Sequence, residues 1–385
     1  MKPIIIIGAG LAGYTLAREF RKLDKTTPLF IITADDGGFY SKPMLSNAIA
    51  QRKEAGQLVT QTAAQMSAQL GATIMTGTRV NHIDTSAKRV ETTAGAFDFE
   101  KLILAVGAQP IRLAFEGDAA GEVMSVNHVD DYARFRNQLA QHEGGARITI
   151  LGAGLIGCEF ADDLAGGGHR ITLVDPNPLP LAAIAAPALS KGLLSALRAR
   201  GVSLQLGTTA ARVERKNAGL QVTLSNGEQL EADVVLSAVG LRPDLRLAQA
   251  AQLQTGRGIV VDIHGQTSAA DVYALGDCAE YVTSSGATCT LPYIAPVMTA
   301  ARAIARTLAG QPTPIDLKPA PVVVKTPSFP LALVPPPVGT TAHGAWQDFQ
   351  HGERLVCRFY DSAGVMTGFG VAPHEAAIRQ ELLGE

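Results

Sequence analysis

The sequence predicts an α/β fold with two Rossmann-like three-layer domains and a small C-terminal α+β domain. Three observations lead to this prediction. The glycine pattern G-x-G-x-x-G occurs twice, at Gly8–Gly13 and Gly152–Gly157, each time directly after an apolar run. Each half of the chain later reaches an apolar stretch that ends in V-G-x-x-P, at Val106–Pro110 and Val239–Pro243. At roughly 150 residues per domain, a chain of 385 residues has room for two or three domains.

The first half opens with a β–α–β unit. A strand is predicted at Ile4–Ile7, a helix from about Gly10 to Leu23, and a strand at Leu29–Thr33. In this setting the first glycine forms a tight turn, the second lets a pyrophosphate approach the backbone, and the third lets the helix pack on the strand. One such pattern is a weak signal, but two in the same context predict two bound dinucleotides.

The second half repeats the unit. Strands are predicted at Arg147–Leu151 and Arg170–Val174 with a helix at Gly154–Ala165 between them, and the second strand ends at Asp175. The elements predicted around these two units are helices at 63–70, 129–141 and 187–200, short strands near 73–75 and 219–224, and apolar runs at 97–106 and 232–239. The shared order of elements predicts an internal structural repeat.

The last third of the chain holds one further strand-to-turn unit and a small terminal region. Ile259–Val261 and Val272–Ala274 are predicted strands, and the second leads into Gly276-Asp277. Pro292–Leu308 is predicted to be a helix with an apolar stripe, and Pro312–Pro337 is proline-rich with strand-like runs at 322–324 and 331–334. The remainder is expected to form a small β-rich domain.

Composition excludes several functional classes. Apolar residues make up 46% of the chain and charged residues 18%, the formal net charge is −2, and no Lys/Arg block occurs, so nucleic-acid binding is not expected. The four cysteines form no C-x-x-C pair, and no histidine spacing indicates a metal site. Cys158 lies just inside a predicted helix, where a packing role is favoured. No apolar run is long enough for a membrane helix or a signal peptide, so a cytoplasmic protein is expected.

Carboxylates that close the second strands indicate which nucleotide binds. Asp175 lies 21 residues after Gly154, the usual distance for a carboxylate that binds a ribose 2′-hydroxyl. No arginine follows closely to hold a 2′-phosphate, so NAD(H) is favoured over NADP(H) at the second site; the alternative is a solvated carboxylate at a strand end. In the first half Asp35 is nearer the usual distance, and Asp36 is interpreted as a turn residue before two glycines.

The segment that ends in Gly276-Asp277 is the most specific single motif. Together with the two fingerprints and the two V-G-x-x-P strand ends, it resembles the two-dinucleotide flavoprotein reductase family. The resemblance implies FAD in the first site, NADH in the second, and Asp277 at the flavin ribityl or pyrophosphate region. The implied domains are an FAD-binding domain at 1–111 and 244–311, an NAD-binding domain at 112–243, and a C-terminal domain at 312–385. Family members that relay electrons to thiols carry C-x-x-x-x-C, which is absent here, so an external acceptor is expected.

A narrower resemblance rests on residues 34–46, 151–161 and 324–327, which are similar to NADH:rubredoxin reductases of bacterial alkane-oxidation systems. Related ferredoxin reductases carry Arg-Pro-Pro-Leu-Ser-Lys where this chain has residues 42–47, and Asn47 replaces the second lysine. The resemblance implies these contacts with FAD: Gly8, Gly10, Leu11, Ala12, Gly13, Thr33, Ala34, Asp35, Lys42, Val80, Gly107, Asp277, Val297 and Lys325. For NAD it implies Gly152, Gly154, Leu155, Ile156, Gly157, Glu159, Asp175 and Gly240.

Four of these residues receive individual roles, and three of them have a simpler alternative. Lys42 is expected to meet FAD phosphate or ribityl oxygens, or else to be an exposed loop lysine. Lys325 is expected near the isoalloxazine, or else to protect a strand edge. Glu159 is expected where nicotinamide meets flavin, or else to complement a helix dipole. Val297 is the expected backbone donor at the N-terminus of a helix that begins near Ala295 and carries Pro296 early.

The implied reaction needs little side-chain chemistry. NADH delivers a hydride to flavin N5, and the flavin passes electrons singly to rubredoxin. No acid–base pair is predicted. Two alternatives stay open: an NADH reductase of a flavorubredoxin or of an oxygenase ferredoxin, and a non-catalytic FAD/NAD-binding signalling flavoprotein.

Overall fold

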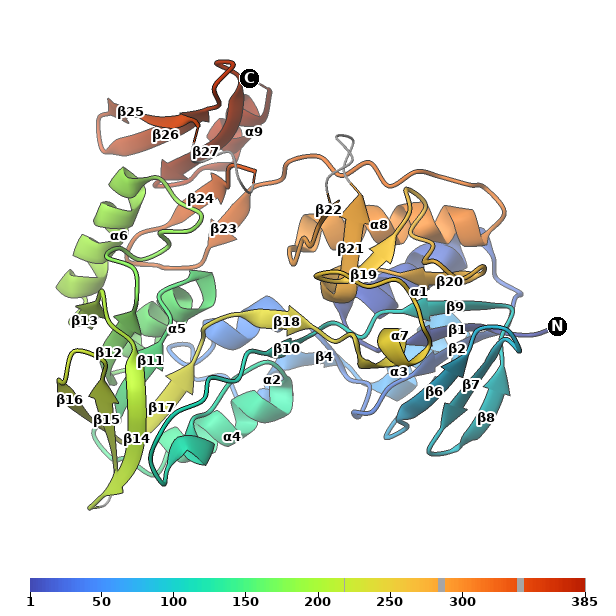
Figure 1. Ribbon diagram of the computed structural model, residues 1–385, viewed down its shortest axis with the longest axis horizontal. Helices are drawn as coiled ribbons and strands as arrows, with labels where there is room; N and C mark the ends of the chain where they lie inside the picture. The colour runs from blue at the N-terminus through green and yellow to red at the C-terminus, as the bar shows by residue number, and fades with distance from the viewer. Residues whose placement is uncertain (218, 283–287, 338–342, 385) are drawn as a thin grey trace. The chain divides into compact units, whose positions relative to one another are not determined.

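The computed structural model describes residues 1–217, 219–282, 288–337 and 343–384, and it divides into two compact units (Figure 1). The first unit comprises residues 1–41, 57–109 and 241–318. The second comprises residues 42–56, 110–240 and 319–385. The boundaries predicted for three domains stay a prediction, and Glu385, the last residue of the third, lies outside the described part of the chain.

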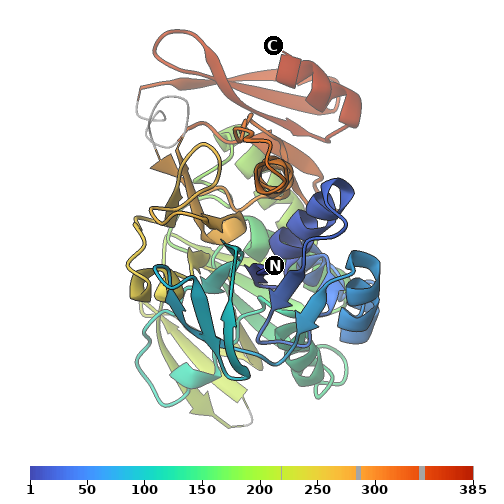
Figure 2. The same ribbon diagram turned by 90° about the vertical axis from the view of Figure 1, so that its right-hand side faces the viewer.

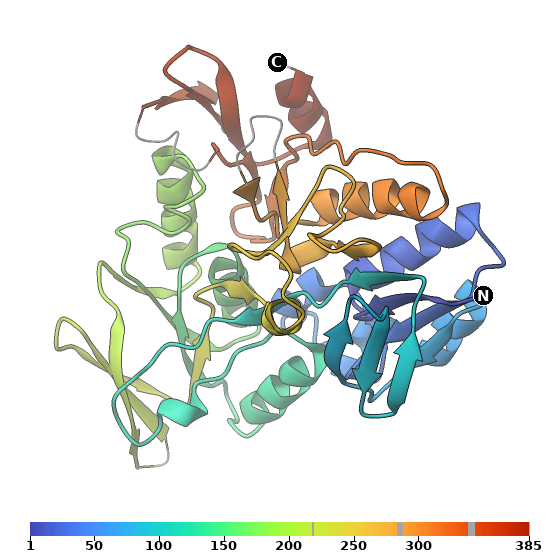
Figure 3. The same ribbon diagram turned by 45° about the vertical axis from the view of Figure 1, so that its right-hand side comes forward.

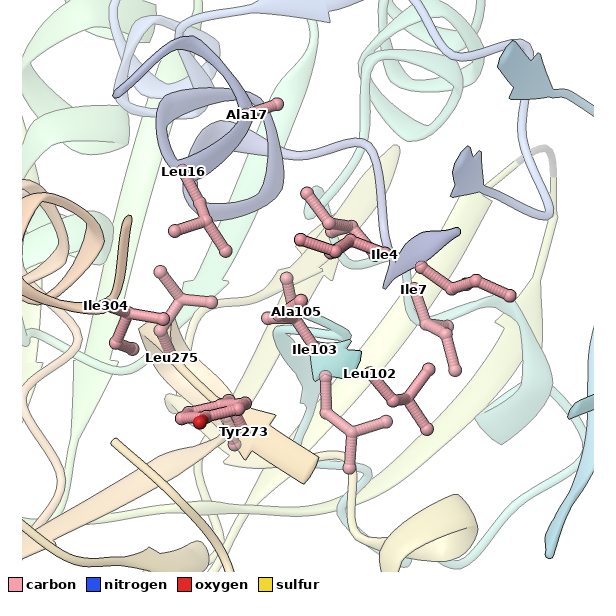
Figure 4. Packing of buried hydrophobic residues seen from close by; sticks show 14 of the residues in the cluster. Ile4, Ile7, Leu16, Ala17, Leu102, Ile103, Ala105, Tyr273, Leu275 and Ile304 are labelled. Carbon is pink, nitrogen blue, oxygen red and sulfur yellow. The ribbon is translucent and has the colours of Figure 1, made fainter. Parts of the chain in front are cut away.

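The first unit is built on a parallel sheet in the order β20-β9-β1-β2-β5. Its strands are β1 (Ile4–Ile7), β2 (Leu29–Ile32), β5 (Thr73–Met75), β9 (Lys101–Leu104) and β20 (Val272–Ala274). Helices α1 (Leu11–Leu23) and α8 (Ile294–Leu308) lie side by side (Figure 3). The core contains the sheet and both helices, since Ile4 and Ile103 on the strands and Leu16 and Ile304 on the helices are all buried (Figure 4).

Smaller elements complete this unit. An antiparallel sheet is formed by β6 (Val80–Asp84), β7 (Arg89–Thr92) and β8 (Gly95–Asp98), and β19 (Ile259–Val261), β21 (Ala279–Val282) and β22 (Thr288–Cys289) form another sheet. The other elements are β3 (Phe39–Tyr40), β4 (Val59–Gln61), α3 (Ala63–Leu70), β18 (Leu241–Pro243), α7 (Arg246–Ala250) and the short helix η3 (Gly276–Cys278). Strand β10 (Ala108–Pro110) begins in the first unit, and its last residue belongs to the second. A short helix α2 (Ala55–Leu58) spans the boundary of the two units.

The second unit contains a parallel sheet in the order β13-β12-β11-β17. Its strands are β11 (Arg147–Leu151), β12 (Arg170–Asp175), β13 (Ser203–Leu206) and β17 (Val234–Ser237), and its helices are α4 (Val129–Leu139), α5 (Leu155–Gly166) and α6 (Pro187–Ala199). Strands β14 (Ala210–Lys216), β15 (Gly219–Leu224) and β16 (Gln229–Ala232) form an antiparallel sheet, and η1 (Lys42–Ser46) and η2 (Ala120–Glu122) are short 3-10 helices.

The two parallel sheets confirm the predicted repeat. In each, the fingerprint strand lies between the next strand of its β–α–β unit and a later strand that follows an antiparallel sheet: β2-β1-β9 in the first unit and β12-β11-β17 in the second. The α/β fold class with two Rossmann-like cores is therefore confirmed.

The C-terminal region is a five-stranded antiparallel sheet in the order β23-β24-β27-β26-β25, with helix α9 (Ala376–Gly384) on one face (Figure 2). The strands are β23 (Val322–Val324), β24 (Leu331–Val334), β25 (Ala345–His351), β26 (Arg354–Tyr360) and β27 (Met366–Ala372). The other face packs on α6, because a Cβ built on Gly370 would fall on the side chain of Leu189. The predicted C-terminal α+β region is confirmed.

Two predicted runs differ from the structure. Residues 97–106 were expected to form one continuous apolar run, but the chain turns at Phe99-Glu100 between β8 and β9. Phe99 is buried there, and its N–H donates to the carbonyl of Lys88, so an apolar residue occupies a turn rather than a strand. The run at 232–239 yields a strand only at Val234–Ser237.

Candidate functional site

The first fingerprint has the geometry of a pyrophosphate site. Gly8 has a φ of +113°, and a Cβ on Gly13 would fall on the carbonyl of Gly8, so both positions require glycine. A Cβ on Gly10, by contrast, would meet nothing within 4 Å. Gly10 is also the N-cap of α1 and provides no side-chain cap. The first N–H groups of α1 therefore face open space beside a bare glycine, which fits a bound pyrophosphate.

The loop after β2 is held by hydrogen bonds to the carboxylates of Asp35 and Asp36. The hydroxyl of Thr33 donates to Asp35 Oδ1 at 2.5 Å, and the N–H of Gly37 donates to the same oxygen at 3.0 Å. Asp36 accepts from the N–H of Gly38 at 2.9 Å, which is the turn role expected for it. Asp35 and Ala34 are exposed at the carboxyl end of β2, so Asp35 is available to ribose hydroxyls.

The turn at Gly276 lies against the first fingerprint. Gly276 has a φ of +82°, and a Cβ there would come within 2.8 Å of the Cβ of Ala12 in α1. Asp277 follows in η3 and is partly exposed. Gly107, with a φ of +68°, has nothing within 4 Å of a built Cβ. The first unit thus brings the Gly276-Asp277 turn to the helix whose N-terminus would hold the pyrophosphate.

Two residues assigned to FAD are buried among other residues of the protein. Val80 is 8% exposed and belongs to the core at the start of β6. Val297 is buried in the first part of α8, and its N–H donates to the carbonyl of Tyr293 across a long 3.4 Å. Helix α8 begins at Ile294 and includes Pro296 as its third residue, so the predicted helix start is confirmed. The contacts of Val80 and Val297 with FAD stay predictions.

The second fingerprint repeats the geometry of the first. Gly152 has a φ of +101°, and a Cβ on Gly157 would fall on the carbonyl of Gly152. Gly154 is the N-cap of α5 without a side-chain cap, and a Cβ there would meet nothing within 4 Å. Leu155 and Ile156 open the helix, and Ile156 is 39% exposed. The residues fit a second dinucleotide.

Asp175 is more deeply set than a solvated carboxylate at a strand end would be. It is 8% exposed, and its Oδ2 accepts from the N–H of Ala153 at 2.6 Å inside the fingerprint. Its Oδ1 accepts from the backbone and side-chain nitrogens of Asn177 at 2.8 and 2.9 Å. Gly240, with a φ of +110°, follows β17, the strand that pairs with the fingerprint strand β11. Asp175 therefore fixes the fingerprint loop and places negative charge beside it.

Glu159 and Lys325 lie together in the second unit. Glu159 is fully buried on α5, beyond the first turn, so the alternative of dipole complementation is wrong. Its Oε2 accepts from Lys325 Nζ at 2.7 Å, and its Oε1 accepts from the backbone N–H of Lys325 at 2.9 Å. Lys325 Nζ also donates to the carbonyl of Pro43 at 2.5 Å. Lys325 directly follows β23, yet its ammonium is engaged with a buried carboxylate rather than protecting a strand edge.

Two further carboxylates lie on the same helix. Asp162 forms an ion pair with Arg200 at 2.9 Å and accepts from the N–H and hydroxyl of Ser328, each at 2.9 Å. Asp163 accepts from the N–H groups of Ile49 at 2.7 Å and Ala50 at 3.3 Å. Burial raises the pKa of Asp163 to about 6, against the lowering effect of these two hydrogen bonds. Helix α5 therefore holds two segments that are distant in sequence, 42–50 and 325–328.

Ser46, Asp162 and Asp163 were not predicted as functional. Ser46 is buried and donates its hydroxyl hydrogen bond to Glu159 Oε2 at 2.5 Å. A signal for the carboxylates exists in the sequence, since positions 159, 162 and 163 share one face of a helix otherwise rich in apolar residues. Lys42 and Lys325, which were assigned to FAD, belong to the second compact unit. Their contacts with FAD stay predictions.

The remaining groups carry no evident chemistry. All four cysteines are free, and burial raises the pKa of the Cys158 thiol far above its usual range, so Cys158 is a packing residue as expected. Within the described ranges, no group of three or more His, Cys, Asp or Glu residues could hold a metal ion. No helix of the described chain is long and apolar enough to cross a membrane.

Comparisons with known proteins agree with this geometry. Residues 2–304 match the family described as pyridine nucleotide-disulphide oxidoreductase, and residues 314–385 match a rubredoxin binding C-terminal domain. A rubredoxin-NAD(+) reductase of Alcanivorax borkumensis is 44% identical over 376 residues, covering 96% of this chain and 95% of the relative. A nitric oxide reductase FlRd-NAD(+) reductase of Aeromonas hydrophila is 37% identical over 383 residues, covering 99% of this chain and 96% of the relative.

Solved structures show the same fold. The putidaredoxin reductase of a covalent putidaredoxin reductase–putidaredoxin complex superposes with a TM-score of 0.89, covering 100% of this chain and 96% of that chain. Its sequence is 24% identical, so the likeness concerns the fold alone.

Proposed function

The chain belongs to the pyridine nucleotide-disulphide oxidoreductase family, and on this basis we propose that it is an FAD-containing NADH:rubredoxin oxidoreductase. It takes a hydride from NADH and delivers electrons singly to rubredoxin. One observation carries the proposal: two dinucleotide sites of matching geometry are followed by a region that matches a rubredoxin binding C-terminal domain. Relatives 44% and 41% identical over most of the chain, both rubredoxin-NAD(+) reductases, support it.

The residues of the first unit fit FAD, which when bound accepts a hydride at N5 and releases electrons one at a time. The N–H groups at the start of α1 bind the pyrophosphate beside Gly10. The carboxylate of Asp35 binds hydroxyls of the adenosine ribose, and Asp277 binds the ribityl or pyrophosphate region. The glycines at 8, 13 and 276 keep the backbone close enough for these contacts.

The residues of the second unit hold NADH and exclude NADPH. The N-terminus of α5 receives the pyrophosphate beside Gly154, and Asp175 places its charge where a 2′-phosphate would be repelled. Glu159 orients Lys325 through both its backbone N–H and its ammonium. Lys325 lies within residues 314–385, so the region that matches a rubredoxin binding domain contributes a cation to the unit that holds NADH.

The physiological setting is also part of the proposal. Electrons delivered to rubredoxin serve alkane hydroxylation, and the enzyme works in the cytoplasm. Stopped-flow mixing with NADH under anaerobic conditions tests the first half-reaction. We expect rapid loss of the visible flavin absorbance; slow or absent bleaching would instead support the non-catalytic signalling flavoprotein.

A second candidate is an NADH reductase of a flavorubredoxin. It is favoured by the FlRd-NAD(+) reductases, which match this chain along nearly its whole length at 33–38% identity. The two candidates are separated by measuring NADH-dependent cytochrome c reduction with rubredoxin, flavorubredoxin or a [2Fe–2S] ferredoxin as the intermediate carrier. We expect the highest kcat/KM with rubredoxin, falling as salt is raised. A higher kcat/KM with flavorubredoxin would assign the second function, and equal rates without any carrier would refute both.

A further inference from the structure

We propose that the hydroxyl groups of two buried tyrosines, Tyr14 and Tyr281, position the two loops that receive the two ends of FAD. The inference rests on the proposed FAD site, and it assigns roles to residues outside that site. Both tyrosines belong to the first compact unit. Neither hydroxyl needs to touch the cofactor, because each holds the backbone of a loop whose carboxylate does.

Tyr14 holds the loop at the adenosine end. It follows Gly13 in α1, is fully buried, and donates from Oη to the carbonyl of Gly37 at 2.5 Å. The N–H of that same Gly37 donates to Asp35 Oδ1 at 3.0 Å. Gly37 is thus held on one side by the fingerprint helix and on the other by the carboxylate that binds the ribose. The ring of Phe39 packs in a T-shaped arrangement against that of Tyr14, with the centroids 5.7 Å apart, and keeps the tyrosine ring in place.

Tyr281 holds the turn at the flavin end. It is 2% exposed on β21, and its Oη accepts from the N–H of Gly276 at 3.1 Å. Gly276 has a left-handed conformation, and Ala12 leaves no room for a Cβ at this position. The same turn is anchored one residue past Asp277 by Cys278, whose Sγ lies 3.4 Å from the carbonyl of Leu104. The hydroxyl therefore fixes the direction in which Asp277 leaves the strand.

The hydroxyls, rather than the rings, carry the proposed role. Burial and the nearby charges of Asp35 and Asp36 raise the pKa of Tyr14 to about 12, so its hydroxyl stays protonated and serves as a donor. Removing it leaves the buried carbonyl of Gly37 without this donor. Removing the Tyr281 hydroxyl deprives the buried N–H of Gly276 of its acceptor. In both cases the loop is free to leave the geometry that suits FAD.

Tyr14→Phe and Tyr281→Phe test the proposal because each deletes one oxygen and keeps the ring. Tyr273→Phe is the matched control: Tyr273 is 4% exposed in the same core, and its side chain interacts with Lys101. The readouts are the Kd of the apoprotein for FAD, from flavin fluorescence, and the Kd for ADP as a competitor. The rate of FAD loss from the diluted holoprotein repeats the test without preparing apoprotein.

We expect each of the two variants to bind FAD about ten-fold more weakly, with the control unchanged. Tyr14→Phe should also weaken ADP binding about ten-fold, whereas Tyr281→Phe should leave ADP binding unchanged and shift the absorption spectrum of the bound flavin. Each variant removes a hydroxyl hydrogen bond of a buried tyrosine, so the thermal midpoints of the three apoproteins should fall by similar amounts. If both variants bind FAD as tightly as the control, or weaken ADP equally, the proposal is wrong. A wild-type chain that binds no FAD refutes the proposed function itself.

Discussion

The ion pair between Lys325 and Glu159 gives the sharpest test of how the second unit is held together. Glu159 is fully buried and accepts three hydrogen bonds, from Ser46, the backbone N–H of Lys325 and the Lys325 ammonium. Lys325→Met removes the ammonium and leaves the carboxylate buried with two neutral donors. Breaking a buried pair in this way costs about 3–5 kcal/mol. The Lys325 side chain is 26% exposed, so water reaches the vacated side, and we expect a loss of about 2–3 kcal/mol.

The assay uses the single tryptophan of the chain. Trp346 lies in the second unit, so its fluorescence in the apoprotein reports the unfolding of that unit by urea. For a unit of this size the expected loss corresponds to a fall in the thermal midpoint of about 5–10 °C. The double variant Glu159→Gln/Lys325→Met removes both charges and should recover most of the stability, giving a coupling free energy of about 2 kcal/mol.

Two results would refute the reasoning. Lys325→Met could change the free energy of unfolding by less than about 0.5 kcal/mol, as is typical of a solvated surface pair. Alternatively, the double variant could be as unstable as the single one, in which case the loss would come from packing of the lysine stem rather than from an uncompensated charge.

Three further outcomes are expected. Because the pKa of Asp163 rises from 3.8 to about 6 on folding, its contribution to stability is present below pH 4 and is lost as the pH rises to about 6. Asp163→Asn should therefore unfold with a flatter pH profile over that window, and urea titrations that run parallel to wild type would contradict this. Gly154→Val, whose added atoms extend into open space, should raise the Kd for NADH at least about ten-fold with the flavin content per chain unchanged; equal NADH binding by calorimetry would contradict the site. Asp175→Asn keeps an oxygen for Ala153 but loses the charge, so the kcat/KM preference for NADH over NADPH should fall about ten-fold; an unchanged ratio would show that the charge does not select the nucleotide.

Local patterns predicted most of the fold. The fingerprint strands, the helices after them and the turn at Gly276 all lie within short segments where glycine spacing and apolar periodicity determine the structure. The prediction of a continuous run at 97–106 was wrong because Phe99 is a buried aromatic residue in a turn. In a sequence, such a residue cannot be distinguished from one inside a strand. Propensity alone cannot separate the two.

The site was predictable only in part. Gly10, Gly154, Asp35 and Asp175 could be predicted as candidates because the roles expected for them depend on distance along the chain, and their contacts with FAD and NAD stay predictions. The environment of Glu159 could not be found in this way, since its partners Ser46 and Lys325 are 113 and 166 residues away. Such pairings are set by tertiary packing, which a single sequence does not display.

The three carboxylates of α5 limit how freely this protein can be recombined. Residues 110–240 look like a self-contained nucleotide-binding module, but the Lys325 ammonium reaches Glu159 and the Ser328 hydroxyl reaches Asp162 only when residues 325–328 have been synthesised. Asp162 already has Arg200 as an ion-pair partner, whereas Glu159 must wait during translation for the last sixth of the chain to supply its cation. A chimaera that exchanges the C-terminal region to accept a different electron carrier should retain Lys325 and Ser328. The graft should begin after them, in the chain that leads to β24.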